Sequence, residues 1–552
     1  MVFKAEQVSF PTIMASTPEN DLFRTVGGFG RYQKIQLIII CLNSFFGVEL
    51  LYNNFILYTP DHWCKLDQLN GYSNLSIAEL KNSTIPWDEK TSTYSSCAMY
   101  DHNLHNSSGV SNDKDDASLT TCNSWHFDDS EYSNTVVTKW HLVCGKAWMA
   151  DLVSSFHVFG FLIGSLAAGW ISDCIGRWKA TMIFGVGKVI GVTMSLFALN
   201  FPFFVAARFI IGVGSMSTYT VGFILVLETT SPGYRTLMGA LLSAMFSFGC
   251  MFLAGIAYIE RDWQRIQLAS AIPTVIIVIS MFFFIHESPR WLLQKGHTEK
   301  GLKVLRRIGE INRQPFFEKV ETSDVQKVEK DDSPVKNKPS LVKLFVAPSI
   351  RRYIFICIVA WCTCSFIYYA LSLNARSLSG DVFINFFLLS AVEIPANLAA
   401  FLCLRTRILG RRKTHIIAYF LAGLACLISV PLIVYYGKSY TTTALAIIGK
   451  AGASTAFTGI YIYTAELFPT EIRNLALGIC SVAARVGAIL APYAGGSLSK
   501  VWTPLPPLIF GITASVTGFL ILLLPETRGK VLKDTVEEEE IDKQAHDVRG
   551  TV

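Results

Sequence analysis

Charged residues are scarce in this chain. Asp, Glu, Lys and Arg make up only 16% of its 552 residues, whereas 51% are hydrophobic. About a quarter of the residues in a soluble domain are charged, so this composition excludes an ordinary soluble globular protein. The formal net charge is a modest +6, and no basic stripe interleaved with aromatic residues is present, which argues against a nucleic-acid-binding protein.

Motifs for catalysis, metals and nucleotides are lacking as well. The run GVGKVIG at 185–191 has no Ser or Thr after its Gly-Lys, as a phosphate-binding loop requires, and it lies within an apolar stretch. Cys362 and Cys364 are one residue apart in an expected helix, which is a poor geometry for chelation. We recognise no catalytic constellation. We therefore expect no enzymatic activity, no metal and no cofactor.

Long hydrophobic runs, by contrast, are abundant. A helix needs roughly 20 apolar residues to cross a bilayer, and twelve runs approach or exceed this length. The expected spans are residues 35–58, 149–172, 180–200, 203–227, 237–259, 266–286, 353–373, 382–404, 414–436, 441–464, 474–496 and 505–524. They predict an all-α membrane protein with twelve transmembrane helices.

The charges between these runs predict the orientation. Segment 59–146 has six Lys and no Arg against twelve Asp and Glu, whereas segment 290–352 has fifteen Lys and Arg against eight Asp and Glu. Positive residues favour the cytoplasmic side. The expected organisation is a cytoplasmic N-terminus at 1–34, a first half at 35–286 with an extracellular loop at 59–146, a cytoplasmic linker at 287–352, a second half at 353–524 and a cytoplasmic tail at 525–552.

The loop 59–146 has further marks of an extracellular segment. It contains three Asn-X-Ser/Thr glycosylation sequons, at Asn74, Asn82 and Asn106. It also contains four cysteines, Cys64, Cys97, Cys122 and Cys144. An even number of cysteines in an acidic, sequon-bearing loop predicts two disulfides, although four cysteines allow three pairings and the sequence does not choose among them.

Three pairs of motifs recur with a nearly constant spacing. LETTSPGYR with Glu228 and AELFPTEIR with Glu466 are 238 residues apart, HESPRWL with Glu287 and LPETRGK with Glu526 are 239 apart, and SDCIGRWK with Gly176 and RILGRRK with Gly410 are 234 apart. This internal repeat indicates two pseudo-symmetric halves of six helices each. Many secondary transporters have such halves, which move around a central site to open it to each side in turn.

The repeated motifs place acidic and basic residues at the expected cytoplasmic ends of helices. Ion pairs there are predicted to act as structural gates rather than as substrate ligands. The candidates are Asp173, Arg177, Glu228, Arg235, Glu287, Arg290, Glu466 and Arg473. The alternative is a set of solvated loop charges that only fixes topology, since exposed ion pairs contribute little.

The same motifs resemble those of a known family. GWISDCIGRWK resembles the G-x-x-x-D-x-x-G-R-[KR] signature of the major facilitator superfamily. ESPRWLLQKG, AELFPTEIRN, LPET and the cysteine-bearing loop ending in TKWHLVC resemble its organic ion transporter branch, solute carrier family 22. The resemblance covers essentially the whole chain. It implies the major facilitator fold and a plasma-membrane carrier of small organic ions.

Within this branch, STYTVGFILVLE and SVAARVGAILAPY look most like the carnitine and zwitterion carriers, and somewhat like the organic anion carriers. The chain departs from the organic cation carriers, which have an Asp where Arg485 stands. It departs from several anion carriers at Asn397, where they have a Lys.

Few charges fall well inside the predicted spans: Glu49, Lys188, Arg208, Glu393, Lys450 and Arg485. A charge at mid-bilayer costs about 2.5–3.5 kcal/mol and usually faces a cavity or a partner. Lys188, Arg208 and Lys450 are expected to pair within the helix bundle. Arg485 and Glu393 are the candidate substrate ligands, because a guanidinium suits a carboxylate and a carboxylate suits an amine. The alternative is a buried salt bridge between the two, or with Glu49.

Aromatic residues complete the expected site. The resemblance implies that residues at positions such as Trp361, Tyr368 and Tyr219 line the central cavity, where ring faces attract quaternary ammonium groups. The alternative is ordinary packing.

We therefore expect transport of zwitterions or cations of the carnitine type by alternating access. An organic anion carrier that uses Arg485 and a non-transporting substrate sensor of the same fold are the alternatives. The expected partners are the substrate and the lipid bilayer, and coupling to sodium, to protons or to exchange stays open.

Overall fold

The structure is a computed structural model that describes residues 28–65, 81–82, 84–88, 93–100, 119–314, 347–406 and 408–529. Within these residues the fold is mainly helical. Ten helical segments are long and apolar enough to cross a membrane. The chain is therefore an all-α membrane protein, as its composition predicts.

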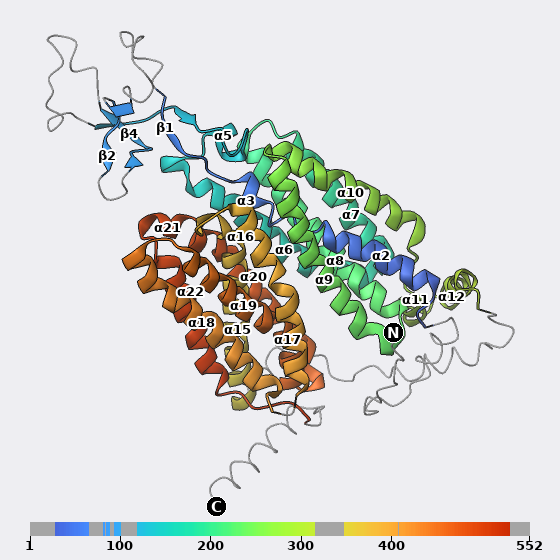
Figure 1. The fold of residues 1–552 in the computed structure, drawn as a ribbon. Helices are drawn as coiled ribbons and strands as arrows, with labels where there is room; N and C mark the ends of the chain where they lie inside the picture. The colour runs from blue at the N-terminus through green and yellow to red at the C-terminus, as the bar shows by residue number, and fades with distance from the viewer. Residues whose placement is uncertain are drawn as a thin grey trace, which may run out of the picture.

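The main helices fall into two sets. The first set is α2 (Arg31–Phe45), α6 (Trp148–Ile175), α7 (Arg177–Leu196), α8 (Phe201–Thr229), α9 (Pro232–Ile259) and α10 (Trp263–Phe284). The second set is α15 (Pro348–Leu373), α16 (Val382–Ala391), α17 (Glu393–Arg405), α18 (Gly410–Tyr436), α19 (Tyr440–Leu467), α20 (Thr470–Gly495) and α22 (Leu505–Ile521). The two sets lie side by side (Figure 1).

Three of the expected spans differ from a simple membrane helix. The span 35–58 is divided into α2 and the short α3 (Asn53–Ile56), with Glu49 in the turn-rich stretch between them. The span 382–404 is divided at Val392 into α16 and α17. The last span corresponds to α22, an apolar helix of 17 residues. Ten helical segments meet the length and apolarity for a crossing, so the count of twelve crossings stays a prediction.

Close helix packing repeats in the two halves at the same spacing as the motifs. A Cβ on Gly249 of α9 would lie 2.0 Å from the carbonyl oxygen of Phe45 in α2, and a Cβ on Gly487 of α20 would lie 2.2 Å from that of Cys362 in α15. These two glycines are 238 residues apart. Small residues let membrane helices approach closely, so each half uses the same glycine to join its first and fifth helices.

The long first loop is built on antiparallel strand pairs. They are β1 (His62–Cys64) with β6 (Trp125–Phe127), β2 (Trp87–Asp88) with β3 (Thr93–Tyr94), and β4 (Ala98–Tyr100) with β5 (Leu119–Thr121). The helix α5 (Val136–Trp140) and the turn η3 (Cys144–Lys146) lead back to α6. Figure 1 shows this loop at one end of the molecule and the helices α11 (Pro289–Gln294) and α12 (Thr298–Asn312) at the other.

The predicted disulfides are present, and the structure selects one of the three pairings. Cys64 is bonded to Cys122, and Cys97 to Cys144. Of the sequons, only Asn82 is described, and its side chain accepts a hydrogen bond from the Tyr94 hydroxyl. Asn74 and Asn106 lie outside the described residues, as do 1–27, 315–346 and 530–552, which hold much of the expected N-terminus, linker and tail.

The two halves join on the side of the strand-bearing loop. Arg376, in the turn η4 (Ala375–Ser377), donates to the carbonyl oxygen of Leu57 at 2.8 Å and lies 3.8 Å from a carboxylate oxygen of Asp151 in α6. The same Asp151 accepts a hydrogen bond from Ser497 of α21 (Ser497–Val501). Burial lowers the pKa of the Arg376 guanidinium, and Asp151 opposes this shift. We call Asp151, Arg376 and Ser497 the outer closure.

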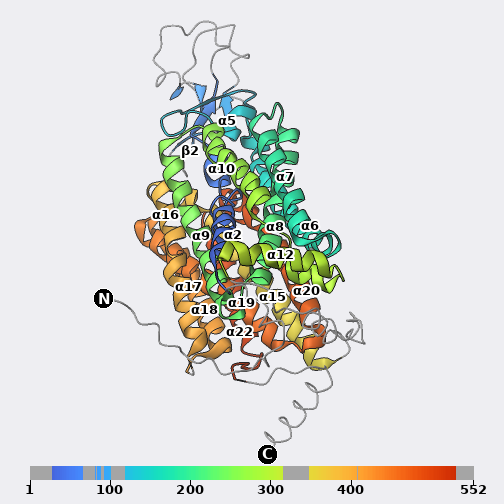
Figure 2. The same ribbon diagram turned by 90° about the vertical axis from the view of Figure 1, so that its right-hand side faces the viewer.

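Opposite this closure, α12 crosses the ends of the first-half helices, as Figure 2 shows. Asn312, its last residue, fixes it there. The Asn312 side chain accepts from the backbone N–H of Tyr32 at 2.8 Å and donates to Gln33 at 3.0 Å.

Candidate substrate site

Arg485 lies on α20 at the boundary between the two halves. Its side chain is buried, and its Nη2 lies 3.4 Å from the sulfur of Met216 on α8, in the opposite half. Its Nε has no hydrogen-bond acceptor among the described residues. No ion pair joins Arg485 to a carboxylate in the part of the chain that the structure describes. A thioether is only a weak acceptor, so the charge of this guanidinium is not compensated there.

Three tyrosines lie near Arg485. Tyr219 comes from α8, Tyr369 from α15 and Tyr461 from α19. Of these, the sequence had indicated only Tyr219. The signal for the other two is position: Tyr369 follows Tyr368 directly, and Tyr461 lies in an apolar helix where a polar ring needs a partner. Both halves therefore contribute side chains around one uncompensated cation.

Glu393 stands in a different environment, at the start of α17. Its carboxylate pairs with Lys450 of α19 at 2.9 Å and accepts from the Tyr368 hydroxyl at 2.8 Å. Ser247, on α9 of the opposite half, donates to its other oxygen at 2.9 Å. Both charged groups are almost fully buried, with 1% of Lys450 and 4% of Glu393 exposed. Glu393 is thus neutralised by Lys450, and the alternative pairing with Arg485 is not seen.

Of the aromatic candidates in the second half, Tyr368 packs against this pair and Trp361 has other partners. Tyr368 places its ring 3.2 Å from the Lys450 ammonium. Trp361 is buried, donates from its indole to Thr464 at 2.9 Å and meets the Tyr461 ring edge-on at 4.3 Å. Trp361 therefore packs against Tyr461, which in turn lies near Arg485.

The remaining intramembrane charges form a separate cluster within the first half. Lys188 pairs with Glu49 at 2.7 Å, and Ser215 lies 3.4 Å from the other oxygen of the same carboxylate. Within the described residues Arg208 donates only to the Glu49 backbone carbonyl, at 3.4 Å, and its guanidinium lies 5.2 Å from the centre of the Phe204 ring. Of the three residues expected to pair within the bundle, Lys188 and Lys450 form ion pairs, whereas Arg208 forms none among the described residues.

The charged motifs at the helix ends opposite the strand-bearing loop form one arrangement twice. In the first half Arg177 pairs with Asp173 at 2.6 Å and with Glu228 at 3.2 Å. Glu287 accepts the backbone N–H of Trp178 at 3.0 Å, which satisfies a free amide at the start of α7. Gly176, with φ of +106°, lets this carboxylate approach, since a Cβ there would lie 2.2 Å from it.

The second half repeats these contacts apart from the Arg177–Asp173 pair. Arg411 pairs with Glu466 at 2.9 Å, and Glu526 accepts the backbone N–H of Arg411 at 2.8 Å at the start of α18. Gly410, with φ of +65°, again stands beside that carboxylate. The internal repeat read from the motifs is therefore a structural repeat. Arg411 and Glu526, quoted in the motifs, belong with the gate candidates.

Some gate candidates have partners other than their neighbours in sequence. Glu228 and Glu466 pair with Arg177 and Arg411, not with the arginines seven residues later. Arg473 instead donates to the backbone carbonyl of Phe468 and to Thr470, each at 3.3 Å. These contacts all lie within one half. Arg235 lies near the start of α9 and Arg290 in α11.

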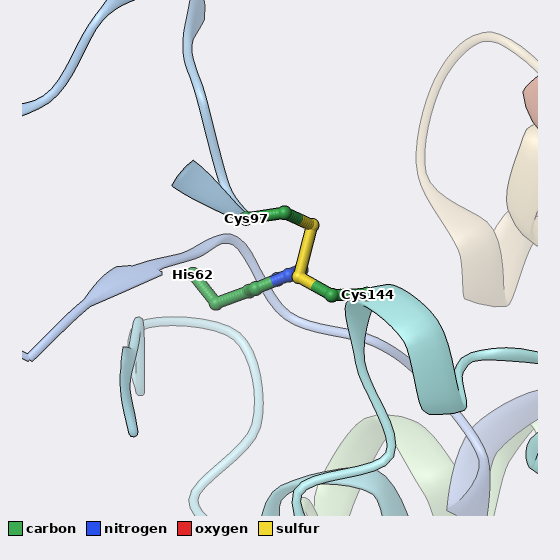
Figure 3. Close-up of side chains that lie close together, drawn as sticks. All are labelled: His62, Cys97 and Cys144. Atoms are coloured by element: carbon green, nitrogen blue, oxygen red, sulfur yellow. A yellow bond between two sulfur atoms is a disulfide. The ribbon is translucent and has the colours of Figure 1, made fainter. Parts of the chain in front are cut away.

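The strand-bearing loop brings three potential metal ligands together. His62, Cys97 and Cys144 place their ligand atoms within 4.8 Å of one another. Figure 3 shows that both sulfurs are joined in a disulfide beside the histidine ring. A disulfide sulfur is not a thiolate, which is the form of cysteine that binds metals. The cluster is therefore not a metal centre in this state.

Comparison with known proteins identifies the family. The model of the sugar (and other) transporter family matches residues 90–538. An organic cation transporter-like protein of Drosophila melanogaster is 33% identical, over 93% of this chain and 91% of that protein. Solute carrier family 22 member 3 of Rattus norvegicus is 32% identical, over 94% of each chain. The chain belongs to solute carrier family 22, within the sugar (and other) transporter family.

Solved structures show the same fold for this carrier. The partially occluded, inward open xylose transporter XylE of E. coli aligns over 91% of this chain and 100% of its own, with a TM-score of 0.61 and 14% identity. XylE is a major facilitator superfamily protein, so the carrier has that fold. The family and fold are those of membrane transporters and not of enzymes.

Proposed function

We propose that this carrier transports small organic ions that bear a carboxylate, by alternating access. The observation that carries the proposal is Arg485, a buried guanidinium at the boundary of the two halves with no carboxylate partner in the described residues. A guanidinium offers a carboxylate two parallel hydrogen bonds. The similar proteins named as organic cation transporters support organic ions as the class of cargo.

Zwitterions of the carnitine type are the first substrates to test. Their carboxylate suits Arg485, and the rings of Tyr219, Tyr369 and Tyr461 beside it suit a quaternary ammonium, at about 0.5–2 kcal/mol per contact. A role for Glu393 in holding the ammonium requires the substrate to compete with Lys450. The aromatic faces therefore support the cationic end of the substrate better than Glu393 does.

Organic anions are the second candidate, and the Glu393–Lys450 pair favours them. Because this pair is internally neutral, Arg485 is the net charge that the boundary presents to a substrate. A substrate with a single carboxylate and no amine would satisfy it. An aromatic carboxylate would also stack on the tyrosine rings.

Uptake into proteoliposomes that contain the purified carrier separates these classes. We expect saturable uptake of labelled carnitine-like zwitterions and much weaker uptake of a quaternary ammonium compound that lacks a carboxylate. Uptake of aromatic carboxylates alone would select the second candidate. Efficient uptake of the cation without a carboxylate would contradict both, and no saturable uptake of any of the three would favour a substrate sensor.

Two variants test which residue binds each end of the substrate. In Arg485→Lys the positive charge stays, but the two parallel hydrogen bonds of the guanidinium are lost. Uptake of carboxylates should therefore fall, while the preference for anionic over cationic substrates is kept. Replacing Glu393 with Gln tests the amine end. If Glu393 holds the amine, zwitterion uptake falls more than uptake of a simple carboxylate, and equal effects would assign Glu393 a structural role.

We also propose the plasma membrane as the location, with both termini in the cytoplasm and the strand-bearing loop outside. The disulfides and the sequon at Asn82 support this orientation, since disulfides persist in oxidising compartments. The paired clusters around Arg177 and Arg411 would brace the cytoplasmic end of each half as it moves. Labelling of Asn82 by glycosylation, read as a mass shift removed by a glycosidase, tests the orientation.

A further inference from the structure

The two disulfides of the strand-bearing loop differ in their exposure. Cys64 and Cys122 are buried, with 0% and 7% of each residue exposed. Cys97 is exposed and Cys144 is half-buried. Thiol–disulfide exchange needs access to one sulfur. Only the Cys97–Cys144 bond offers it.

A histidine lies beside the accessible disulfide. His62 is the first residue of β1, and a nitrogen of its ring lies within 4.8 Å of both sulfurs (Figure 3). Its Nδ1 lies 3.0 Å from the carbonyl oxygen of Pro60, which helps to orient the ring. Histidine is the side chain whose ordinary pKa allows it to give or take a proton near neutral pH. A departing thiolate would therefore have a proton source next to it.

The backbone at Cys144 adds a second observation. Cys144 has φ of +54°, in the left-handed region that side chains other than glycine rarely adopt. Such strain persists only where the surrounding structure holds it, and it gathers at switch regions. The disulfide is one of the restraints on Cys144. Opening it would let this backbone relax.

We propose that the Cys97–Cys144 disulfide is a thiol-exchange site that an external low-molecular-weight thiol opens with help from His62. The thiolate of the reagent attacks Sγ of Cys97 and forms a mixed disulfide. The Cys97–Cys144 bond breaks, and Cys144 leaves with a proton from the His62 imidazolium. A second reagent thiolate attacks the mixed disulfide, which releases Cys97 and the oxidised dimer of the reagent. The protein disulfide gains two electrons and two protons, and two reagent thiols are oxidised.

The site connects to the outer closure through α6. Cys144 begins the turn η3, and Asp151 of the closure lies seven residues later in the chain. In the oxidised state the disulfide ties the entry to α6 to the β4–β5 strand pair. Exchange at this bond would free that entry, and with it the segment that positions Asp151 against Arg376 and Ser497. The outer closure would then depend on the redox state of the loop.

The first test compares the two disulfides within the wild-type carrier. The full chain in lipid nanodiscs is exposed to reduced glutathione, with a chelator present so that metals do not mask the thiols. Freed thiols are trapped by rapid alkylation, and peptide mass spectrometry reads each cysteine. We expect Cys97 and Cys144 to be labelled about tenfold faster or more than Cys64 and Cys122, from the difference in access. Equal rates for the two pairs would overturn the proposal.

A histidine variant tests the chemistry separately from the access. In His62→Gln the Cys97–Cys144 bond should open severalfold more slowly. His126→Gln is the matched control, because His126 lies on the neighbouring strand β6, against the Trp63 ring, and should leave the rate unchanged. The slow opening of Cys64–Cys122 in both variants reports that the loop is folded. Equal rates for His62→Gln and His126→Gln would remove His62 from the reaction.

Discussion

Replacing Arg485 with Met separates substrate binding from stability more sharply than any other change in the boundary region. Met keeps much of the aliphatic length of Arg and removes the charge. The matched variant is Lys450→Met, which makes the same kind of change at a cation that has a carboxylate 2.9 Å away. Both side chains are buried, with 5% of Arg485 and 1% of Lys450 exposed. The two variants therefore differ mainly in what they leave unpaired.

The magnitudes follow from the partners. Arg485→Met leaves no described carboxylate without its cation, so the free energy of unfolding should be unchanged or higher. Lys450→Met leaves the buried carboxylate of Glu393 without its cation, and breaking a buried pair costs about 3–5 kcal/mol. For substrate, two charge-assisted hydrogen bonds are worth about 1.5–3 kcal/mol each. Their loss in Arg485→Met should weaken the binding affinity for a carboxylate substrate by roughly a hundredfold or more, since a tenfold change corresponds to about 1.4 kcal/mol.

Thermal unfolding of the purified variants and uptake of a carboxylate substrate measure the two effects. We expect Arg485→Met to reach the membrane, to unfold no earlier than wild type and to lose carboxylate uptake. Lys450→Met should unfold earlier, and Lys450→Met with Glu393→Gln should recover part of the loss because no charge is stranded. An early unfolding of Arg485→Met, or unchanged uptake, would refute the assignment of Arg485 to the substrate.

Three further outcomes test the structure. Glu49→Gln should lower the unfolding temperature because Lys188 stays buried without its carboxylate, and adding Lys188→Met should restore it, as thermal unfolding would show. Gly176→Ala should reduce folded protein in size-exclusion chromatography, because φ is +106° and the new Cβ meets Glu287, while Gly187→Ala, with open space around it, should not. Arg376→Ala should weaken the outer closure, so that a cysteine pair introduced across it cross-links more slowly than in the parent.

Much of the fold follows from the sequence, because a membrane imposes simple requirements on it. Apolar runs of about 20 residues must be helices in lipid, and the helices lie where the runs lie. The repeat was readable because Glu228 and Glu466 occupy equivalent motif positions in the two halves, 238 residues apart. The break after α2 was not readable, because the stretch around Glu49 is as apolar as a helix and its turns depend on contacts with other helices.

The candidate site could be read only in part. A lone Arg485 in an apolar run signals a partner or a substrate, but its sequence neighbours do not reveal which. The pairing of Glu393 with Lys450 joins residues 57 positions apart on different helices, and no local pattern encodes it. Likewise, Glu228 meets Arg177, 51 residues earlier, rather than Arg235 nearby. Helix packing selects these partners, whereas spacing along one helix only makes them available.

The distribution of buried charge gives the strongest reason to expect an anionic group on the substrate. Of the six charges well inside the spans, two cancel in the Glu49–Lys188 pair and two in the Glu393–Lys450 pair, which leaves Arg208 and Arg485. Arg208 is enclosed within the first half, with 1% of the residue exposed, so it cannot meet a ligand between the halves. Arg485 lies against Met216 of the other half and can.

The family resemblance read from the sequence implies an Asp in organic cation carriers at the position of Arg485, and a change from Asp to Arg moves the local charge by two units. At a separation of about 6 Å and an effective dielectric of about 20, each unit is worth roughly 3 kcal/mol for a monovalent substrate. A simple cation that such a carrier accepts would therefore meet a penalty of roughly 6 kcal/mol here, and an anionic group would gain a comparable amount. A zwitterion remains acceptable only if its carboxylate, and not its amine, faces Arg485.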